Sequence, residues 1–376
     1  MGAIRGEVSG PTLIVVGGIH GNEPAGVLAG RRVLERLREG RIPIAGELVV
    51  LAGNVGALGL GQRYQAKDLN RQWTEERVAA LAARTRPSGC PPVPGEDAED
   101  REQRELYLAL QEVMGRARGP VYLVDFHTTS AAGIPFVLYG DTPRHRAFAR
   151  HFPLPAILGL EELVDGVLVE WLSHRGCVTM VLEAGQHDDP SSVDNLEAAL
   201  WLALDAAGLA GQERLPEFAR SWARLERARG DLPHVMEVLS RHAVTPEHEF
   251  RMEPGFANIA RTRAGQLLAR DRRGEIRAAR DGLLFMPLYQ GQGQDGFFLG
   301  REVAHWRMEV SHWMRRLRLD VLLPLLPGVR RDRRRGDVLH IDTRIAHYYP
   351  LEVFHLFGFR KVRQQGSRLQ VARRPH

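Results

Sequence analysis

The chain has 376 residues, more than a single domain usually holds, so we expect two domains. Hydrophobic residues make up 44% and charged residues 26%, an ordinary balance for a globular protein, and no apolar run is long enough to cross a bilayer. The formal net charge of +5 comes largely from the arginine-rich C-terminal part. Two cysteines, Cys90 and Cys177, exclude a disulfide framework, and with no signal-peptide pattern they lead us to expect a cytoplasmic protein.

Apolar strands alternate with amphipathic helices over the first 210 residues. The periodicity predicts, in chain order, a strand at 12–18, a helix at 25–40, a strand at 46–54, a loop at 56–74, a helix at 101–117, a strand at 120–130, a strand at 177–189, and a helix at 191–209 that begins near a serine cap. This order predicts an α/β fold with a mixed, largely parallel sheet flanked by helices. Polar clusters follow several strands, at the edge where open α/β sheets build their sites.

The composition of the sequence and the elements that it predicts change after about residue 210. We expect residues 1–210 to form the α/β domain and residues 211–230 to form a charged helical connector. Residues 231–310 contain short β-like runs split by glycine and proline, which predicts a smaller β-rich domain. Residues 311–376 form a basic C-terminal extension to which the sequence assigns no role.

The stretch VVGGIHGNEPAG places His20 and Glu23 three residues apart on a glycine-rich turn after a predicted strand. Imidazole and carboxylate are both good zinc ligands, and a turn lets two such residues point to one side. By itself, this stretch is more typical of a polar surface loop. The spacing is not that of the helical H-E-x-x-H motif, and the stretch lacks the lysine of a phosphate-binding loop.

Two further strands end in groups of the same chemistry. His127 closes the apolar run in VDFHTTS, with Asp125 two residues earlier on the same face, where it can accept a hydrogen bond from the ring. Glu183 follows the buried run VTMVL, a costly position for a carboxylate that is neither paired nor functional. His187 and the aspartates after it are expected to lie in a surface loop.

The predicted loop QRYQAKDLNRQW carries Arg63, Asn70 and Arg71 together with Asp68. Guanidinium groups bind carboxylates through paired hydrogen bonds, so two arginines and an amide near a metal suggest an anionic substrate. The alternative is a solvated loop in which Asp68 pairs with an arginine.

Taken in this order, GGIHGNE, DLNR, DFH and LEAG resemble the succinylglutamate desuccinylase/aspartoacylase family, a branch of the zinc carboxypeptidase superfamily. The resemblance runs from about residue 12 to about residue 303. It implies a carboxypeptidase-like α/β domain with a smaller β domain that covers the site. It also implies an enzyme that uses zinc-activated water and a glutamate general base to deacylate an N-acyl amino acid.

The resemblance also implies a role for each matching residue. It makes Glu183 the general base and Arg63 the group that polarises the scissile carbonyl. It places the substrate carboxylate on Asn70 and Arg71, and one Zn²⁺ per chain on His20, Glu23 and His127.

Two departures from the aspartoacylase pattern bear on the substrate. The nearest candidate for a further substrate-binding arginine is Arg175, at a shifted spacing. Phe297 and Phe298 stand where aspartoacylases have a tyrosine pair, and they cannot donate that hydrogen bond; Tyr289 is nearby. These changes put N-acetylaspartate itself in doubt and favour a more apolar acyl group or side chain.

Other classes of protein remain open at this point. A metallocarboxypeptidase-like peptide hydrolase would use the same zinc ligands. A basic binding protein would use the run VRRDRRRGD and the basic tail, although we do not expect nucleic acid because no base-reading motif is present. We expect a small-molecule substrate and no membrane partner, and a homo-oligomer stays open.

Overall fold

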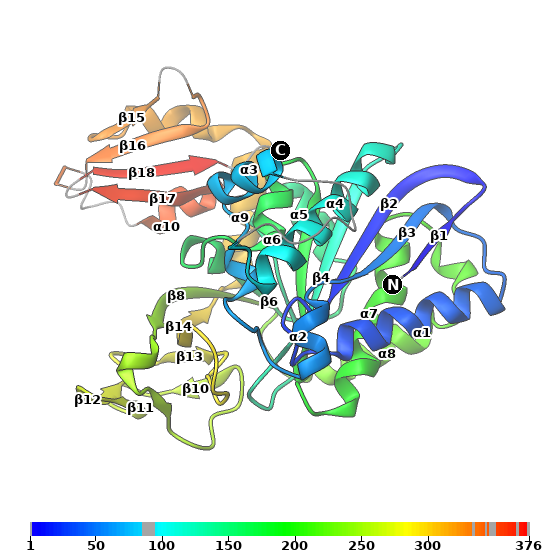
Figure 1. Cartoon of the computed structure of the whole chain (residues 1–376). Helices are drawn as coiled ribbons and strands as arrows, with labels where there is room; N and C mark the ends of the chain where they lie inside the picture. The colour runs from blue at the N-terminus through cyan, green and yellow to red at the C-terminus, as the bar shows by residue number, and fades with distance from the viewer. Residues whose placement is uncertain are drawn as a thin grey trace.

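In the computed structural model, the part of the chain that is described comprises residues 2–84, 95–332, 335–342, 344–345, 351–365 and 368–373. A helix-covered sheet forms the body of the molecule, with a β-rich region and a C-terminal lobe on one side (Figure 1). Cys90 and part of the basic tail lie outside the described residues. Within those residues, no helix is long and apolar enough to cross a membrane.

One mixed sheet of 11 strands runs through the molecule. Its strands, in spatial order, are β1 (Gly2–Arg5), β3 (Ala45–Ala52), β2 (Val8–Gly17), β4 (Val121–Thr129), β7 (Val178–Gln186), β5 (Phe136–Leu138), β6 (Ala156–Leu158), β8 (Val235–Ala243), β14 (Asp295–Glu302), β13 (Gly282–Phe285) and β10 (Ala260–Thr262). The four strands β3, β2, β4 and β7 are mutually parallel, as the alternating sequence predicts. Their carboxyl ends therefore meet at one edge.

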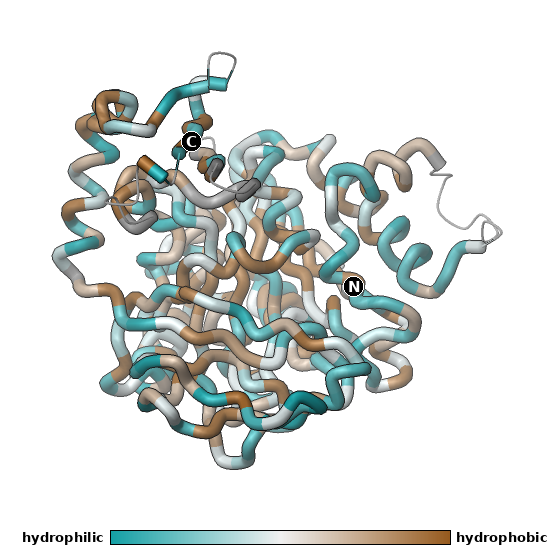
Figure 2. The backbone as a smooth tube through the Cα atoms, turned by 90° about the vertical axis from the view of Figure 1, so that its left-hand side faces the viewer, coloured by the Kyte–Doolittle hydropathy of each residue, from teal (hydrophilic) through white to brown (hydrophobic). Residues whose placement is uncertain are grey.

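Helices cover both faces of this parallel part. One face packs on α1 (Ala25–Glu39), α5 (Pro143–Ala149), α7 (Pro190–Ala206) and α8 (Phe218–Arg229). The other packs on α3 (Glu75–Arg84), α4 (Ala98–Arg116) and α6 (Leu168–Ser173). Along β2, Leu13 and Val15 enter the first core while Ile14 and Val16 enter the second. Burial on both faces explains why the strand sequence is continuously apolar rather than alternating, and Figure 2 shows these hydrophobic strands in the middle of the molecule.

Local structure departs from the sequence-based expectation in two places. The predicted loop at 56–74 contains the short helix α2 (Val55–Leu60), because the Asn54 side chain caps it by accepting a hydrogen bond from the Ala57 amide. Helix α7 is capped by Asp189, which accepts from the Ser191 amide, rather than by a serine. Short 3₁₀ turns also occur at η1 (Leu69–Arg71), η2 (Leu160–Glu162), η3 (Gln212–Arg214), η4 (Pro246–His248) and η5 (Leu319–Leu325).

Most strands of the region 231–310 join the main sheet, and the others form a small sheet of their own. Strand β8 pairs in parallel with β6, and β14, β13 and β10 continue from β8. A three-stranded sheet of β9 (Arg251–Met252), β11 (Leu267–Asp271) and β12 (Gly274–Arg277) packs against this extension. The division into domains at residues 210, 230 and 310 stays a prediction.

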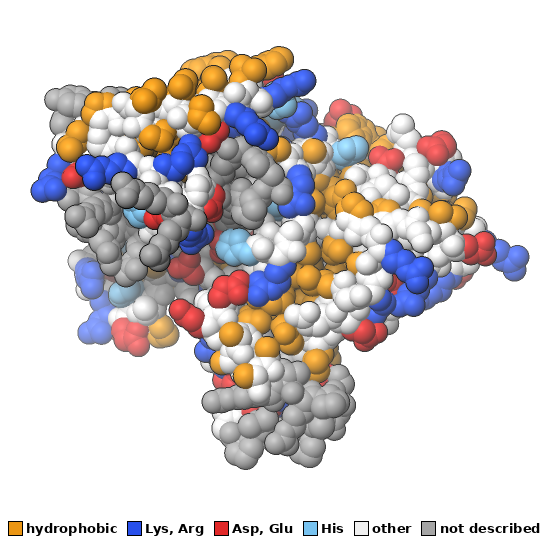
Figure 3. All heavy atoms as spheres, turned by 90° about the horizontal axis from the view of Figure 1, so that it is seen from above, with side chains coloured by type: hydrophobic (Ala, Val, Ile, Leu, Met, Phe, Trp, Pro, Cys, Tyr) orange, Lys and Arg blue, Asp and Glu red, His pale blue; other side chains and the backbone are white. Residues whose placement is uncertain are grey.

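The C-terminal lobe has its own apolar cluster. It consists of α9 (His305–Arg316), α10 (Leu351–Leu356) and a four-stranded sheet of β15 (Val329–Arg331), β16 (Val338–Asp342), β17 (Phe359–Gln365) and β18 (Arg368–Arg373). Trp306, Trp313 and Leu317 of this lobe are exposed. Figure 3 shows hydrophobic side chains gathered beside Lys and Arg on the face that includes the lobe.

We expect Gly17→Ala to lower the free energy of unfolding by about 1–3 kcal/mol, because overpacking forces backbone shifts. A Cβ at Gly17 would lie 2.6 Å from the Gly26 carbonyl carbon, where β2 meets the start of α1. Gly59→Ala is the matched control: it has no neighbour within 4 Å and lies in helix α2, so we expect no loss there. Urea unfolding of both variants measures the difference, and equal stabilities would contradict the tight contact.

Candidate metal centre and active site

The site lies at the carboxyl ends of β2, β4 and β7. The turn after β2 carries His20 and Glu23, while His127 of β4 is paired in register with Glu183 of β7. The turn is held against the following loop by a hydrogen bond from the Gly21 amide to the Arg63 carbonyl, 3.0 Å long. A Cβ at Gly21 would lie 2.1 Å from the Ala57 carbonyl carbon, so only glycine permits this approach.

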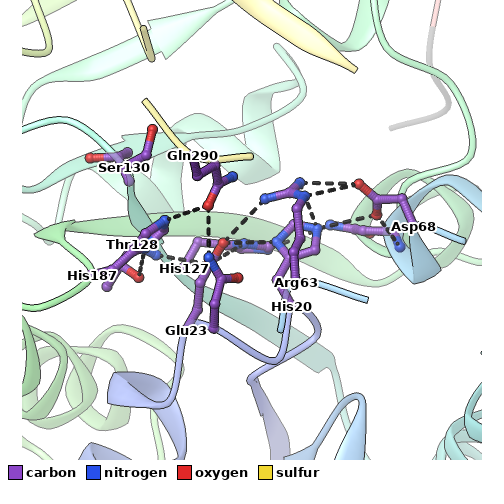
Figure 4. Close-up of polar contacts among 12 residues, drawn as sticks. His20, Glu23, Arg63, Asp68, His127, Thr128, Ser130, His187 and Gln290 are labelled. Carbon is purple, nitrogen blue, oxygen red and sulfur yellow. Dashed lines mark hydrogen bonds and ion pairs between the residues drawn. The ribbon is translucent and has the colours of Figure 1, made fainter. Parts of the chain in front are cut away.

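His20, Glu23 and His127 form a buried group, with 4%, 2% and 5% of their surfaces exposed. One potential ligand atom from each lies within 4.8 Å of the other two. The Glu23 carboxylate lies between the rings: Oε1 is 3.0 Å from His20 Nδ1 and Oε2 is 3.1 Å from His127 Nδ1 (Figure 4). Two imidazoles and a carboxylate that converge in this way are a donor set suited to a divalent metal.

A second carboxylate contacts the Nε2 atom of each histidine. His20 Nε2 lies 3.2 Å from Asp68 Oδ1, and His127 Nε2 lies 3.0 Å from Asp125 Oδ2. A carboxylate on the outer nitrogen fixes the ring orientation and leaves Nδ1 facing Glu23, as is usual for metal-binding histidines. The sequence indicated this role for Asp125, whereas Asp68 was assigned only to a loop.

The pKa values of the group follow from these contacts. Burial by itself would raise the pKa of Glu23, but His20 and His127 outweigh it and hold that pKa well below its usual value. Burial would lower the pKa of His127, but Asp125 and Glu23 raise it well above the ordinary histidine value.

Arg63 points into the same group of charges. Its Nη2 lies 3.1 Å from Asp68 Oδ2 and 2.9 Å from His20 Nε2, and its Nη1 lies 3.4 Å from Glu23 Oε1 (Figure 4). The guanidinium thus compensates the negative charge of Asp68. It also lines the cavity beside His20, Glu23 and His127, which we call the metal group.

Asn70 and Arg71 lie in η1 and line the same cavity. Asn70 Oδ1 accepts a hydrogen bond from the Leu168 amide at 2.9 Å, which leaves Nδ2 near His127, 3.5 Å from its Nε2. Arg71 donates through Nη2 to Asp295 Oδ2 at 2.6 Å. Its Nε is buried and has no hydrogen-bond partner among the described residues. A buried donor without a partner is costly, and a ligand oxygen would satisfy it.

Glu183 is buried on the wall of the cavity, opposite His127 in the parallel ladder. Its Oε2 has no hydrogen-bond partner within the part of the chain that is described. Burial raises the pKa of Glu183 to about 8, with His127 acting against the shift and Glu23 adding to it. A carboxyl group with such a pKa can take up and release a proton near neutral pH.

His187 is the clearest error of the sequence-based expectation, which assigned it to a surface loop. Its Nδ1 lies 2.7 Å from Thr128 Oγ1 and its Nε2 lies 3.0 Å from Gln290 Oε1, at the edge of the cavity. His187 follows the end of β7, and its two partners come from β4 and from the β-rich region, so no local residue pattern indicates its position. Gln290 also accepts from Asn22 Nδ2, so it joins the β-rich region to the His20 turn.

Other residues considered from the sequence lie elsewhere. Arg175 pairs with Glu75 at 2.8 Å and stacks on Trp171, outside the residues that line the cavity. The Tyr289 hydroxyl donates to the Glu253 carbonyl at 2.8 Å and the residue is 39% exposed. Phe297 packs away from the cavity, against the ring of His242, and Phe298 lines it.

Comparison with known proteins shows the family to which the chain is similar. Residues 9–198 match the model of the succinylglutamate desuccinylase/aspartoacylase catalytic domain. The chain is similar to the succinylglutamate desuccinylase of Burkholderia orbicola strain AU 1054, with 34% identity over 278 residues, 69% of this chain and 71% of that protein. It is 25% identical over 295 residues to the enzyme of Burkholderia thailandensis, covering 73% and 75% of the two chains.

Two solved structures share the fold. The structure of a succinylglutamate desuccinylase/aspartoacylase from Rhodobacter sphaeroides has a TM-score of 0.57 and 18% identity, covering 81% of this chain and 88% of that one. The product-bound ectoine utilization protein EutE (DoeB) from Ruegeria pomeroyi has a TM-score of 0.53 and 21% identity, covering 80% and 87%.

The family model and the curated relatives together define the class of protein as a hydrolase that acts on an amide bond. The chain belongs to the succinylglutamate desuccinylase/aspartoacylase family, as the sequence motifs indicated.

We expect His127 to stabilise the metal-free protein more at low pH than at high pH. Its pKa is raised by folding, so its contribution is fully present below the unfolded value of about 6.5 and is lost as the pH rises through the folded pKa. Urea unfolding with a chelator present, at about pH 6 and about pH 9, compares the wild type with His127→Asn. The stability difference between them should shrink as the pH rises.

His151→Asn is the control for this measurement, because the His151 side chain is 49% exposed. A difference for His127→Asn that stays constant or grows with pH would contradict the raised pKa of His127.

Proposed function

We propose that the protein is a zinc-dependent amidohydrolase that removes the acyl group from an N-acyl amino acid. The observation that carries the proposal is the buried group of His20, Glu23 and His127 beside a Glu183 carboxylate oxygen that has no partner among the described residues. Membership in a family of desuccinylases and aspartoacylases supports the class of reaction. Free, buried Cys177 agrees with a reducing compartment, and we retain the cytoplasm as the expected location.

The donor set fits a zinc ion. His20 Nδ1, His127 Nδ1 and a Glu23 oxygen would hold it, and two nitrogens with one carboxylate match open catalytic zinc sites. Asp68 and Asp125 hold the outer nitrogens and so leave both Nδ1 atoms available. When bound, zinc lowers the pKa of water at the site and polarises a carbonyl oxygen.

In the proposed mechanism, Glu183 moves the proton. Its unpartnered Oε2 accepts a proton from the attacking water and then delivers it to the nitrogen of the leaving amine. Burial supports this role because it raises the pKa of Glu183 to about 8, so that the carboxyl group can exchange a proton near neutral pH. The products are a carboxylic acid and a free amino acid.

Arg63 and the Asn70–Arg71 pair supply the remaining polar groups. Arg63 would stabilise the negative charge that develops on the carbonyl oxygen. The α-carboxylate of the substrate would accept from Asn70 Nδ2 and from the Arg71 Nε–H, which lacks a partner in the part of the chain that is described. Fixing the substrate by its carboxylate lowers the entropic part of the barrier.

We expect the purified protein to bind about one zinc ion per chain and to hydrolyse N-acetyl, N-formyl or N-succinyl amino acids. Metal analysis, joined to measurement of the released amine over such a panel, tests both parts. Activity should fall on chelation and return when zinc is added.

Dipeptides with a free N-terminus belong in the same panel. Hydrolysis of these dipeptides in preference to all N-acyl amino acids would replace the proposal with a peptide hydrolase. Zinc-loaded protein that cleaves neither class would refute the amidohydrolase assignment.

Glu183→Gln should lower kcat by about 10²–10⁴-fold, since it keeps the shape of the side chain but removes the proton acceptor. Zinc content should stay at the wild-type level, because Glu183 is not among the three grouped ligand residues. The control is Glu112→Gln, whose side chain is 77% exposed on α4. A Glu183→Gln enzyme with zinc bound and full turnover would show that another group is the base.

A further inference from the structure

The cavity that the metal group lines continues along β7, where several of its lining residues are apolar. Thr179, Val181 and Glu183 alternate along β7 and therefore face the same side of the sheet. Leu138 of β5 is paired with Val181, so it extends the same face. The apolar surface thus begins directly beside the carboxylate of Glu183. We call this surface the side-chain channel, and its wall consists of Leu138, Leu160, Val164, Val167, Val181 and Phe298.

The side-chain channel is joined to the Asn70–Arg71 pair. The Leu168 amide, next to Val167 of the wall, donates to Asn70 Oδ1 at 2.9 Å. The Trp73 amide donates to the Gly166 carbonyl at 3.0 Å. These two hydrogen bonds hold the segment that carries the wall against the segment that carries the pair. A carboxylate bound by Asn70 and Arg71 would therefore lie beside the channel and not across the cavity from it.

Beyond the two arginines already assigned to the scissile carbonyl and to the α-carboxylate, the described lining of the cavity offers no guanidinium for an acidic side chain. The described residues that line it include two arginines, Arg63 and Arg71, and both already face carboxylates: Asp68 for Arg63 and Asp295 for Arg71. The lining also includes the carboxylates of Glu161 and Glu170. An aspartate or glutamate side chain there would meet apolar groups and like charges, both of which disfavour it.

We propose that the side-chain channel binds the side chain of the amino acid that is released, and that the preferred substrates carry an apolar, uncharged side chain at this position. This inference rests on the proposed function, because it takes the α-carboxylate to be held by Asn70 and Arg71. The Cα atom of such a substrate bears the amide nitrogen, the carboxylate and the side chain. With the nitrogen near Glu183 and the carboxylate on Arg71, the channel receives the third substituent.

A substrate matrix tests the assignment. One series varies the amino acid at a constant acyl group: N-acetyl leucine, methionine, alanine, lysine and aspartate. The other varies the acyl group at a constant amino acid: N-acetyl, N-butyryl, N-hexanoyl and N-succinyl alanine. We expect kcat/KM for N-acetylleucine to exceed that for N-acetylaspartate by at least about tenfold, with a smaller gain along the acyl series.

Val164→Phe places a larger side chain in the channel wall. We expect the ratio of kcat/KM for N-acetylleucine to that for N-acetylalanine to fall by at least about tenfold in this variant. Leu163→Phe is the matched control, because Leu163 packs in the same apolar cluster but is not among the residues that line the cavity. An equal fall in both variants would mean a general loss of packing and would overturn the role of Val164.

Calorimetric titration of the zinc-loaded protein with free leucine and free aspartate gives a readout that does not depend on turnover. We expect leucine to bind more tightly. Preference for aspartate or lysine, or a larger gain from a longer acyl chain than from leucine, would overturn the inference. If no amide in the matrix is hydrolysed, the proposed function fails, and the order of leucine and aspartate in the titration alone decides the inference.

Discussion

The arrangement of the site depends on burying the Glu23 carboxylate between two imidazole rings. A charged carboxylate removed from water is costly unless charged or hydrogen-bonded partners replace its hydration. His20 and His127 supply those partners, and they shift the pKa of Glu23 downward against the effect of burial. The rings in turn require Asp68 and Asp125 behind them. Four further ionisable groups thus surround the Glu23 carboxylate, two of them in direct contact with it.

The sheet brings together these site residues, which lie far apart in the sequence. β4 lies between β2 and β7, so the His20 turn, His127 and Glu183 reach the same edge of the sheet. Cores on both faces of β2 hold that edge rigid. The result is a group of side chains whose spacing is set by strand separation and whose orientation is set by the outer carboxylates.

The extension of the sheet determines what lies around the metal group. Pairing of β8 with β6 carries β14 toward the site, and β14 contributes Asp295 and Phe298 to the cavity. Asp295 forms ion pairs with both Arg71 and Arg241. Its carboxylate therefore partly compensates the positive charge of these two arginines before any ligand binds. Phe298 adds apolar surface where a tyrosine would have added a hydroxyl. The grouped residues His20, Glu23 and His127 and the cavity lining at Asp295 and Phe298 therefore come from different parts of the chain.

The sequence by itself determined the class of fold, the parallel strands and the family, because doubly buried strands are continuously apolar and the motifs follow strand ends in a characteristic order. It also predicted that His20, Glu23, His127 and Glu183 would be associated, and the structure brings them together. It did not indicate the position of His187 beside the cavity, because its partners Thr128 and Gln290 lie far away in the sequence.

Only the tertiary structure decided that the β-rich region extends the main sheet and that Asp295 meets Arg71 across 224 positions of the chain. It also decided that Arg175 lies outside the cavity. The physical reason is the range of the interactions. Hydrophobic periodicity and turn chemistry act between near neighbours and can be recognised in one segment, whereas ion pairs and cavity walls depend on which distant segments the completed sheet places side by side.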